Sequence, residues 1–306
     1  MKIEGIHHVT CITGDAPGNV DFYVRVLGLR MVKKTVNQDD PTVYHLFYAD
    51  EAGSAGADIT FFEYPGSPRG RAGDGMVHTT VFRVGSDASL DYWAERLGSD
   101  EVATHRDGKS LRFEDPEGLG LELMVTDAPD APLVAEHPDI PAEHRLQGFE
   151  GVRAYSSAPG NSQRLLEEGL GFESGRDDTW TVIGDERRGW ITYDEPPQQR
   201  GLSGAGTVHH VAWASTMDDH EAWRERVRAV GMHPTPVIDR FWFLSVYFRE
   251  PSGVLFEIAT LGPGFTADEP LETLGEKLTL PPKFEGFRDQ LEQALTPLPD
   301  TTALRS

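Results

Sequence analysis

Three short segments carry side chains that could bind a metal ion. Two are histidine pairs, His7-His8 and His209-His210, each inside a β-rich stretch. The third is Glu257, a carboxylate within an apolar run of strand length. A charge in such a place is costly unless it is paired or bound to a metal. Two neutral imidazoles and one carboxylate form the facial triad of non-haem Fe(II), so the set indicates metal chemistry if the fold brings the segments together.

The two members of a pair cannot both face one metal ion in a regular strand. Side chains alternate along a strand, so His7 and His8 point to opposite faces unless the strand bulges, and the same holds for His209 and His210. Periodicity does not decide which member binds. The other member either orients the ligand by a hydrogen bond or packs on the far face. Thr10 shares the face of His8.

The segments that must position these residues follow one repeated pattern. A strand, a helix and then further strands occur four times along the chain. Such internal similarity is the mark of a fold built from repeats. Short sequences recur between the halves, since Ala16-Pro17-Gly18-Asn19 reappears as Ala158-Pro159-Gly160-Asn161. The four modules span residues 5–64, 75–126, 148–194 and 206–261.

The repeats suggest that a unit of two modules was duplicated. We therefore predict an N-terminal domain at 1–126 and a C-terminal domain at 148–262. The linker between them, 127–147, is rich in Pro, Ala and Asp and has no apolar periodicity.

This order of elements resembles the vicinal oxygen chelate superfamily, which includes glyoxalases, bleomycin-resistance proteins and extradiol dioxygenases. The resemblance covers about residues 3–262. It implies an α+β fold in which four βαβββ modules pair into two curved, barrel-like domains. The extradiol signature asks for a hydrophobic residue and Tyr, an acidic or small polar residue and Pro, a Gly and a Glu. The matching residues are Val246-Tyr247, Glu250-Pro251, Gly253 and Glu257.

One departure from the extradiol signature indicates which branch of the superfamily the chain resembles. Catechol-type enzymes have a histidine seven residues before the Tyr, and this chain has Arg240 there. With its two His pairs, the chain is similar to the branch that opens hydroquinones, including chlorinated and methylated ones. In that branch the metal ligands are the second His of each pair and the Glu, which implies His8, His210 and Glu257.

The resemblance also implies the reaction, an Fe²⁺- and O₂-dependent cleavage of a small aromatic diol, although the sequence does not separate Fe²⁺ from Mn²⁺. Tyr247 and Arg240 would hydrogen-bond the substrate oxygen and stabilise developing charge. His209 or His7 would move protons. Thr10 is a further candidate on the ligand face.

Two other functions occur on the same fold. A glyoxalase-type lyase or isomerase uses Zn²⁺ or Ni²⁺ without oxygen and usually has two carboxylates and two histidines on the metal. Glu63 is the candidate for that second carboxylate. A non-catalytic binder of the bleomycin-resistance kind needs no metal, which leaves the His–His–Glu set unexplained.

The ligand positions imply that the first and fourth modules share one cavity and that the second and third modules form another. In the second cavity Glu122 stands at the place of Glu257. Arg153-Ala154 stands where the first His pair would be, and Thr79 stands at the second ligand position. Since Ala154 and Thr79 cannot complete a triad, we expect no metal in the second cavity.

Composition limits the partners. The formal net charge is −22, from 28 Lys and Arg against 50 Asp and Glu, which argues against nucleic acid and anionic membrane surfaces. A single cysteine, Cys11, allows no internal disulfide. No charged-then-apolar leader opens the chain, and no apolar run approaches the length of about 18 residues that a membrane span needs. A cytoplasmic location is therefore expected. The oligomeric state is left open, and a homo-oligomer is compatible with the sequence.

The tail, 263–306, is predicted to contain a helix from Phe284 to Leu295 that packs on the barrel through Phe284, Phe287, Leu291 and Leu295. The remaining histidines have no comparable context and are interpreted as ordinary residues. They are His45, His105, His137, His144, His220 and His233.

Overall fold

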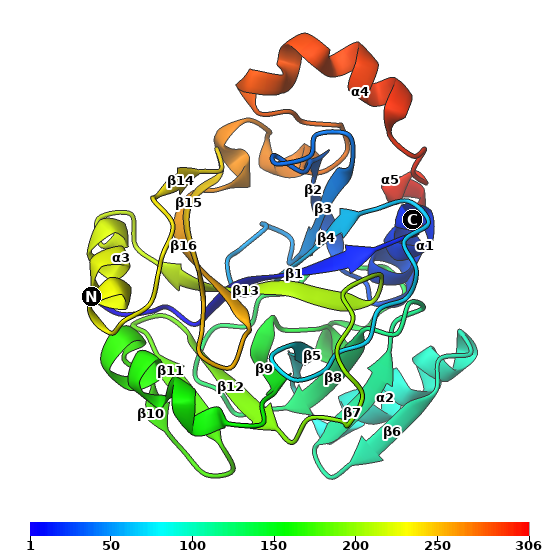
Figure 1. Cartoon of the computed structure of the whole chain (residues 1–306). Coiled ribbons are helices and arrows are strands. Elements are labelled where there is room, and N and C mark those ends of the chain that lie inside the picture. The colour runs from blue at the N-terminus through cyan, green and yellow to red at the C-terminus, as the bar shows by residue number, and fades with distance from the viewer. Residues whose placement is uncertain (306) are drawn as a thin grey trace.

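Two curved sheets of eight strands each dominate the computed structural model, which describes residues 1–305 (Figure 1). Ser306, the last residue of the predicted tail, lies outside the described residues. The first sheet combines strands of modules one and four, and the second combines strands of modules two and three. The predicted α+β class is confirmed, and so is the pairing of modules. Each sheet combines one module from 1–126 with one from 148–262. The proposed domain boundaries therefore stay a prediction.

In the first sheet, the central strands belong to modules one and four and run antiparallel to each other. Both are buried over nearly their whole length, as their apolar sequences require. The strand order is β14 (Ile238–Asp239), β15 (Phe243–Arg249), β16 (Leu255–Pro263), β13 (Thr207–Ser215), β1 (Ile6–Thr13), β4 (Asp58–Glu63), β3 (Tyr44–Ala49) and β2 (Arg30–Val36).

The second sheet repeats this order with the strands of modules two and three. Its central strands are again antiparallel, and each is flanked by a parallel strand of its own module. The strand order is β10 (Glu173–Ser174), β11 (Thr179–Ile183), β12 (Arg188–Asp194), β9 (Phe149–Tyr155), β5 (Val77–Val84), β8 (Gly120–Val125), β7 (Ser110–Glu114) and β6 (Thr104–Asp107).

Alternation along β1 separates the core from the candidate site. Val9 and Cys11 belong to a hydrophobic core shared by both sheets, which also contains Trp213 of β13. His8 and Thr10 point to the other face and are equally buried. The same strand therefore anchors the fold with one face and presents polar side chains with the other.

Each of the four modules has a helical segment after its first strand, as the repeated pattern predicts. The first module has a short α-helix that continues as a π-helical turn and stops before Gly28, whose φ is +70°. In the second module, the helix begins after Ser86, whose side chain caps it by accepting a hydrogen bond from the Ser89 amide. Within residues 1–305 no helix combines the length and apolar character needed to cross a membrane. The helical segments of the four modules are α1 (Ala16–Val20) with the turn Asp21–Val26, α2 (Asp87–Ser99), the turns Pro159–Ser162 and Leu165–Leu170, and α3 (His220–Ala229).

The tail differs from its prediction in one respect. A 3₁₀ segment, Pro282–Phe287, precedes α4 (Arg288–Ala294), so the predicted single helix is two segments. Leu291 and Leu295 are buried as expected, but Phe287 is 54% exposed. A 3₁₀ segment has about three residues per turn, so the α-helical spacing does not bring Phe287 to the packed face.

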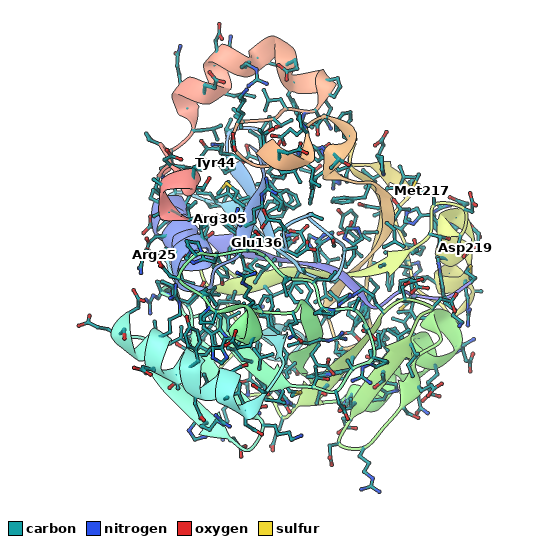
Figure 2. All side chains as sticks on the ribbon, turned by 180° about the vertical axis from the view of Figure 1, so that it is seen from behind. Arg25, Tyr44, Glu136, Met217, Asp219 and Arg305 are labelled. Carbon is teal, nitrogen blue, oxygen red and sulfur yellow. The ribbon has the colours of Figure 1, made fainter. Side chains whose placement is uncertain are left out.

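The end of the tail returns to the body of the protein. Arg305, which follows α5 (Thr301–Leu304), donates to the backbone oxygen of Glu136 in the linker and pairs with Glu51 at 2.8 Å. Figure 2 shows Arg305 and Glu136 close to one another on the far side of the molecule. Hydrogen bonds of Arg305 thus join the end of the tail to the linker and to the first module.

Candidate metal centre

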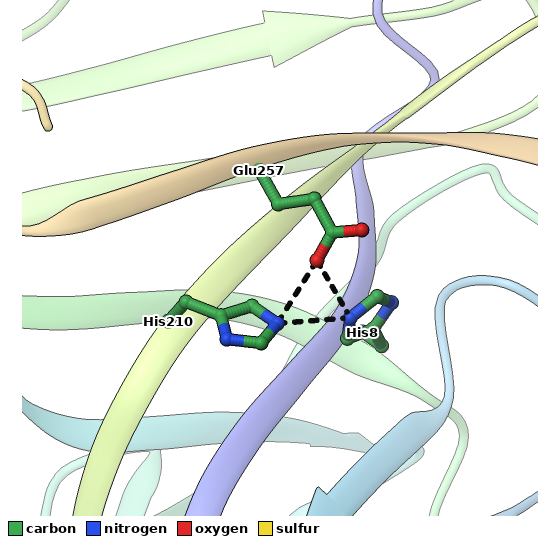
Figure 3. Close-up of side chains that lie close together, drawn as sticks. All are labelled: His8, His210 and Glu257. Atoms are coloured by element: carbon green, nitrogen blue, oxygen red, sulfur yellow. Dashed lines mark hydrogen bonds and ion pairs between the residues drawn. The ribbon is translucent and has the colours of Figure 1, made fainter. Parts of the chain in front are cut away.

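His8, His210 and Glu257 meet on the inner face of the first sheet (Figure 3). Glu257 Oε2 lies 3.1 Å from His8 Nε2 and 2.9 Å from His210 Nε2, and the two Nε2 atoms are 3.2 Å apart. All three side chains are at most 4% exposed. The strands β1, β13 and β16 are adjacent, which is how residues separated by some 200 positions in the chain come together.

The register of the sheet places the three ligands side by side. Ala212 of β13 lies opposite His8 on one side and opposite Glu257 on the other, while His210 lies opposite Thr10. Because the side chain of Ala212 is small, the side chains of His8 on β1 and Glu257 on β16 can approach each other above β13.

Each first histidine is the extra residue of a β-bulge. The pairing of β1 with β13 shifts between Ile6 and His8, and again opposite His209, so that neither His7 nor His209 has a cross-strand partner. As a result both members of each pair are brought into contact. His7 Nδ1 lies 2.9 Å from His8 Nδ1, and His209 Nδ1 lies 2.8 Å from His210 Nδ1.

The hydrogen bonds of His7 fix the tautomer of His8. His7 Nε2 lies 3.1 Å from the Thr260 backbone oxygen, which can only accept, so Nε2 carries the proton. The neutral ring of His7 then accepts at Nδ1 from the Nδ1–H of His8. This leaves the lone pair of His8 on Nε2, the atom that faces Glu257 and His210. His7 therefore orients His8 as a ligand, and of the two alternatives for this residue the structure favours the hydrogen-bonding one.

His209 makes the same contact with His210 from a more open position. It is exposed, and its ring lies 5.4 Å from that of Phe62. Burial lowers the pKa of His7 to about 3, and burial also lowers the pKa of His210. Both rings are neutral at neutral pH, which is the state that a metal ligand requires.

The triad has the chemistry of a cation site. Burial by itself would raise the pKa of Glu257, and only positive charge or donated N–H groups at the nitrogens of His8 and His210 bring it well below its usual value. An ionised carboxylate and two imidazole lone pairs thus converge, and neither oxygen of Glu257 has an ordinary hydrogen-bond donor within residues 1–305. Either a proton or a metal ion must lie among them. Neighbouring ligands of an octahedral ion with bonds of about 2.1 Å lie about 3.0 Å apart, close to the spacing seen here.

A small cavity of about 30 Å³ lies over the triad. Arg240 and Tyr247, both predicted from the signature, line it together with His8 and His210. Arg240 Nε lies 3.4 Å from the Tyr247 hydroxyl, and its guanidinium sits 5.4 Å above the Tyr247 ring. Burial raises the pKa of Tyr247, so its hydroxyl keeps its proton. Because Arg240 donates to the hydroxyl oxygen, the Tyr247 proton remains available to a ligand in the cavity.

A loop between β2 and β3 closes one side of this cavity. Asp39 binds both Nη atoms of Arg240, at 3.0 and 2.9 Å, and Gln38 Nε2 donates to the Arg240 backbone oxygen at 2.6 Å. The next residue, Phe241, has a φ of +73°, a strained value for a side chain of its size. The Arg240 side chain is thus fixed by a loop that is remote in sequence, which the signature does not include.

Thr10, the last predicted site residue, does not face the cavity directly. Its hydroxyl lies 2.8 Å from that of Thr60, which in turn lies 2.9 Å from His45 Nε2. His45 lines the cavity and is held between the rings of Phe47 and Phe62, with centroids at 3.9 and 4.4 Å. His45, interpreted from the sequence as an ordinary residue, thus lies at the wall of the cavity. His45 lies inside an ordinary strand segment, and no motif in the sequence marks it as a cavity residue.

Aromatic side chains complete the walls. Phe243 packs on both His7 and His8 at 5.3 Å, and Trp242 and Phe62 lie on other sides of the same cavity. Aromatic walls with a few convergent polar groups are typical of sites that bind small planar molecules.

Glu63 lies away from the triad. In the pairing of β1 with β4, Asp58 is the residue beside His8, whereas Glu63 lies beside Thr13 at the far end of the strand. Among residues 1–305, the group of potential metal ligands contains His8, His210 and Glu257 and no second carboxylate.

Comparison with known proteins agrees with this geometry. Residues 5–123 and 134–258 match the model of the Glyoxalase/Bleomycin resistance protein/Dioxygenase superfamily. The chain belongs to this superfamily. It is 40% identical over 305 residues to MhqO of Bacillus subtilis strain 168, a candidate ring-cleaving dioxygenase, with 97% of each chain covered. It is 32% identical over 310 residues to a chlorohydroquinone/hydroquinone 1,2-dioxygenase of Sphingobium indicum, with 95% of each covered.

Solved structures of this superfamily have the same fold. A dioxygenase candidate from Bacillus subtilis superposes with a TM-score of 0.90 at 39% identity, covering 97% of this chain and 98% of that one. Glyoxalase I of Zea mays, in a mutant form, reaches a TM-score of 0.57 at 16% identity over 84% of this chain and 92% of that one, a likeness of fold alone. The predicted membership of the superfamily is confirmed.

Proposed function

We propose that this protein is an Fe²⁺- and O₂-dependent dioxygenase that opens the ring of a hydroquinone-type diol. The observation that carries the proposal is the convergence of two imidazole lone pairs and one carboxylate at the floor of an aromatic-walled cavity. The names of its relatives, one of them a chlorohydroquinone/hydroquinone 1,2-dioxygenase, support the same reaction class.

The residues of the cavity have distinct tasks in this proposal. His8, His210 and Glu257 would hold the metal, Fe²⁺ or its replacement Mn²⁺, which lowers the pKa of a coordinated hydroxyl and brings diol and O₂ together. His7 and His209 keep the Nε2 lone pairs of His8 and His210 directed inward. Aromatic walls orient the ring of the substrate.

Three polar groups act on the substrate itself. Tyr247 donates a hydrogen bond to an oxygen of the diol, and Arg240, with its permanent charge, stabilises negative charge that develops there. His45 supplies a third group, since its Nδ1 makes no hydrogen bond within residues 1–305 while its Nε2 contacts Thr60. The hydrogen bonds from Thr10 through Thr60 to His45 Nε2 fix the orientation of the His45 ring at the cavity wall.

Oxygen uptake tests the proposed reaction. The purified protein is loaded with Fe²⁺ without air and mixed with hydroquinone, methylhydroquinone or chlorohydroquinone. Air is then admitted, and dissolved O₂ and product absorbance are followed. We expect stoichiometric uptake with ring opening, lost on chelation. No uptake with any of these diols or with catechols would contradict the proposal and favour an oxygen-independent lyase.

His45 is expected to contribute to turnover without binding the metal. His45→Phe keeps the packing against Phe47 and Phe62 but removes both nitrogens. We expect kcat/KM for the diol to fall about 10- to 100-fold, as for the loss of a strong hydrogen bond, with metal content unchanged. The exposed His233 provides the matched control, His233→Phe, which should keep the parent rate. A full rate in His45→Phe would exclude a role for His45.

Glu63 separates the dioxygenase from the glyoxalase-type alternative. Since Glu63 lies at the end of β4 away from His8, Glu63→Gln should leave metal content and O₂ uptake within about twofold of the parent, as for a substitution away from the site. Loss of the metal in this variant, measured by elemental analysis, would identify Glu63 as a fourth ligand and support the lyase.

A further inference from the structure

The second sheet reproduces the framework of the metal centre with different side chains. Glu257 lies opposite Ala212 and Tyr247, and Glu122 lies in the same way opposite Val81 and Arg112. Both bulges recur as well, now at His78 and Glu150. The residues at corresponding positions can therefore be assigned from the register.

That register corrects one prediction from the sequence. The residues at the place of the first His pair are Glu150 and Gly151, and Arg153 corresponds to Thr10. The predicted placement of Arg153-Ala154 was shifted because the bulge at Glu150 is invisible in the sequence. Thr79 does correspond to His210, as predicted.

In this second site, arginine guanidinium groups contact the carboxylate of Glu122, at the position where a metal ion would lie in the first site. Arg153 Nε lies 2.8 Å and Arg112 Nε 3.2 Å from Glu122 Oε2, while Ser110 donates to Oε1 at 2.6 Å. The missing side chain at Gly151 makes this possible. A Cβ there would lie 2.2 Å from the Trp190 ring, on which the Arg153 guanidinium is stacked at 5.4 Å.

A cleft of about 1130 Å³ lies over these residues. Arg112 projects into it and is 46% exposed, and its two Nη groups donate no hydrogen bond within residues 1–305. Arg69 and Arg71 line the same cleft, and their hydrogen bonds go to the backbone oxygens of Pro116 and Arg200. Of these three arginines, only Arg112 forms a salt bridge with a carboxylate. Its partner is Glu122, which also forms a salt bridge with Arg153.

Most acidic groups of the cleft are already engaged. Asp115 accepts from two backbone amides and from Tyr23, Glu117 accepts from the Gly14 amide, and Asp100 pairs with Arg25 outside the cleft. Glu101 and Glu114 remain at the exposed rim.

The other wall of the cleft is aromatic. His78 stacks on Tyr155 at 3.9 Å and is held by Asp194 at 3.0 Å. This flat, fixed pair lines the same cleft as Arg112.

We propose that the second cleft binds small organic carboxylates, with Arg112 as the group that holds the carboxylate. Its open Nη donors form the planar fork that matches two carboxylate oxygens. Arg69 and Arg71 add positive charge that offsets the repulsion of anions by a chain of net charge −22. The stacked His78 and Tyr155 offer a flat surface to a ring or to a conjugated chain. In this arrangement the metal site recognises oxygen anions through a metal, and its counterpart recognises them through guanidinium groups.

Binding of benzoate to the metal-loaded protein, measured by titration calorimetry and ligand-observed NMR, tests the proposal. Benzamide has the same shape without the charge, and cis,cis-muconate is an open-chain dicarboxylate without the ring. We expect benzoate to bind and benzamide not to bind. Muconate binding as well as benzoate would show that the carboxylate suffices, whereas benzoate alone would show that the stacked wall contributes.

Two arginine variants locate the site. Arg112→Gln should weaken benzoate binding at least about tenfold, because the forked hydrogen bonds are lost. Arg106→Gln removes a charge on the adjacent strand β6 that does not line the cleft, and should leave the affinity unchanged. The proposal is overturned if benzoate and benzamide bind alike, if benzoate does not bind at about 10 mM, a very weak affinity, or if Arg112→Gln binds as the parent does.

Discussion

We expect Glu257→Gln to abolish both metal binding and oxygen uptake. The amide keeps the shape of the side chain but brings an NH₂ group and no charge to a point where two imidazole lone pairs converge within 3.1 Å. The remaining two histidines bind a divalent ion too weakly to retain it, and changes to ligand surroundings alone already cost about 10- to 100-fold in metal affinity. Elemental analysis after dialysis and the O₂ electrode measure the two losses.

Glu122→Gln is the matched control, because Glu122 has the same register position in the second sheet. It should keep the metal and the oxygen uptake. It should also be less stable, since Arg153 and Arg112 lose the charge of a fully buried partner. If Glu257→Gln retained a stoichiometric metal, or if Glu122→Gln lost it, the assignment of the ligands would be wrong.

The parts of the site that sequence could predict are those with a local signature. His pairs and the turn before Glu257 are visible as patterns, and the alternation of side chains separates Thr10 from the core residue Cys11. The order of the four modules gives the fold because each module is a local unit. These features depend on residues close together in the chain.

The parts that sequence could not predict depend on sheet register and on distant contacts. The bulges at His7 and His209 change which side chains meet, and nothing in the residue types announces them. Asp39 reaches Arg240, and His45 reaches the cavity, only because β2 and β3 lie in the same sheet as β15. A pattern that contains the ligands therefore need not contain the residues around them.

The role of the tail, 263–306, also depends on contacts between residues distant in sequence. The tail was predicted to pack through one helix, but its first residues also support the cavity. Lys33 of β2 is fully buried, and its ammonium pairs with Asp268 at 2.9 Å and with Glu269. Asp268 also accepts from the indole of Trp242 at 2.9 Å, and Trp242 lines the cavity over the triad. The tail is thus bound to the cavity wall through one buried cation.

Lys33→Met should destabilise the protein by about 3–5 kcal/mol, the cost of removing one partner of a buried ion pair. Asp268 and Glu269 would be left facing each other with no cation between them. Urea unfolding measures the loss. The KM for the diol should rise as well, because Trp242 loses the fixed acceptor that holds its ring against the cavity.

Lys34→Met provides the control on the next residue of the same strand. Lys34 is half-buried and donates to the backbone oxygen of Glu276, so its replacement should cost no more than about 1.5 kcal/mol, the contribution of one ordinary hydrogen bond. Equal stability of the two variants would show that the buried cation does not hold the tail. A loss of stability in Lys33→Met without any change in KM would separate the two roles, since the tail would then stabilise the fold without shaping the cavity.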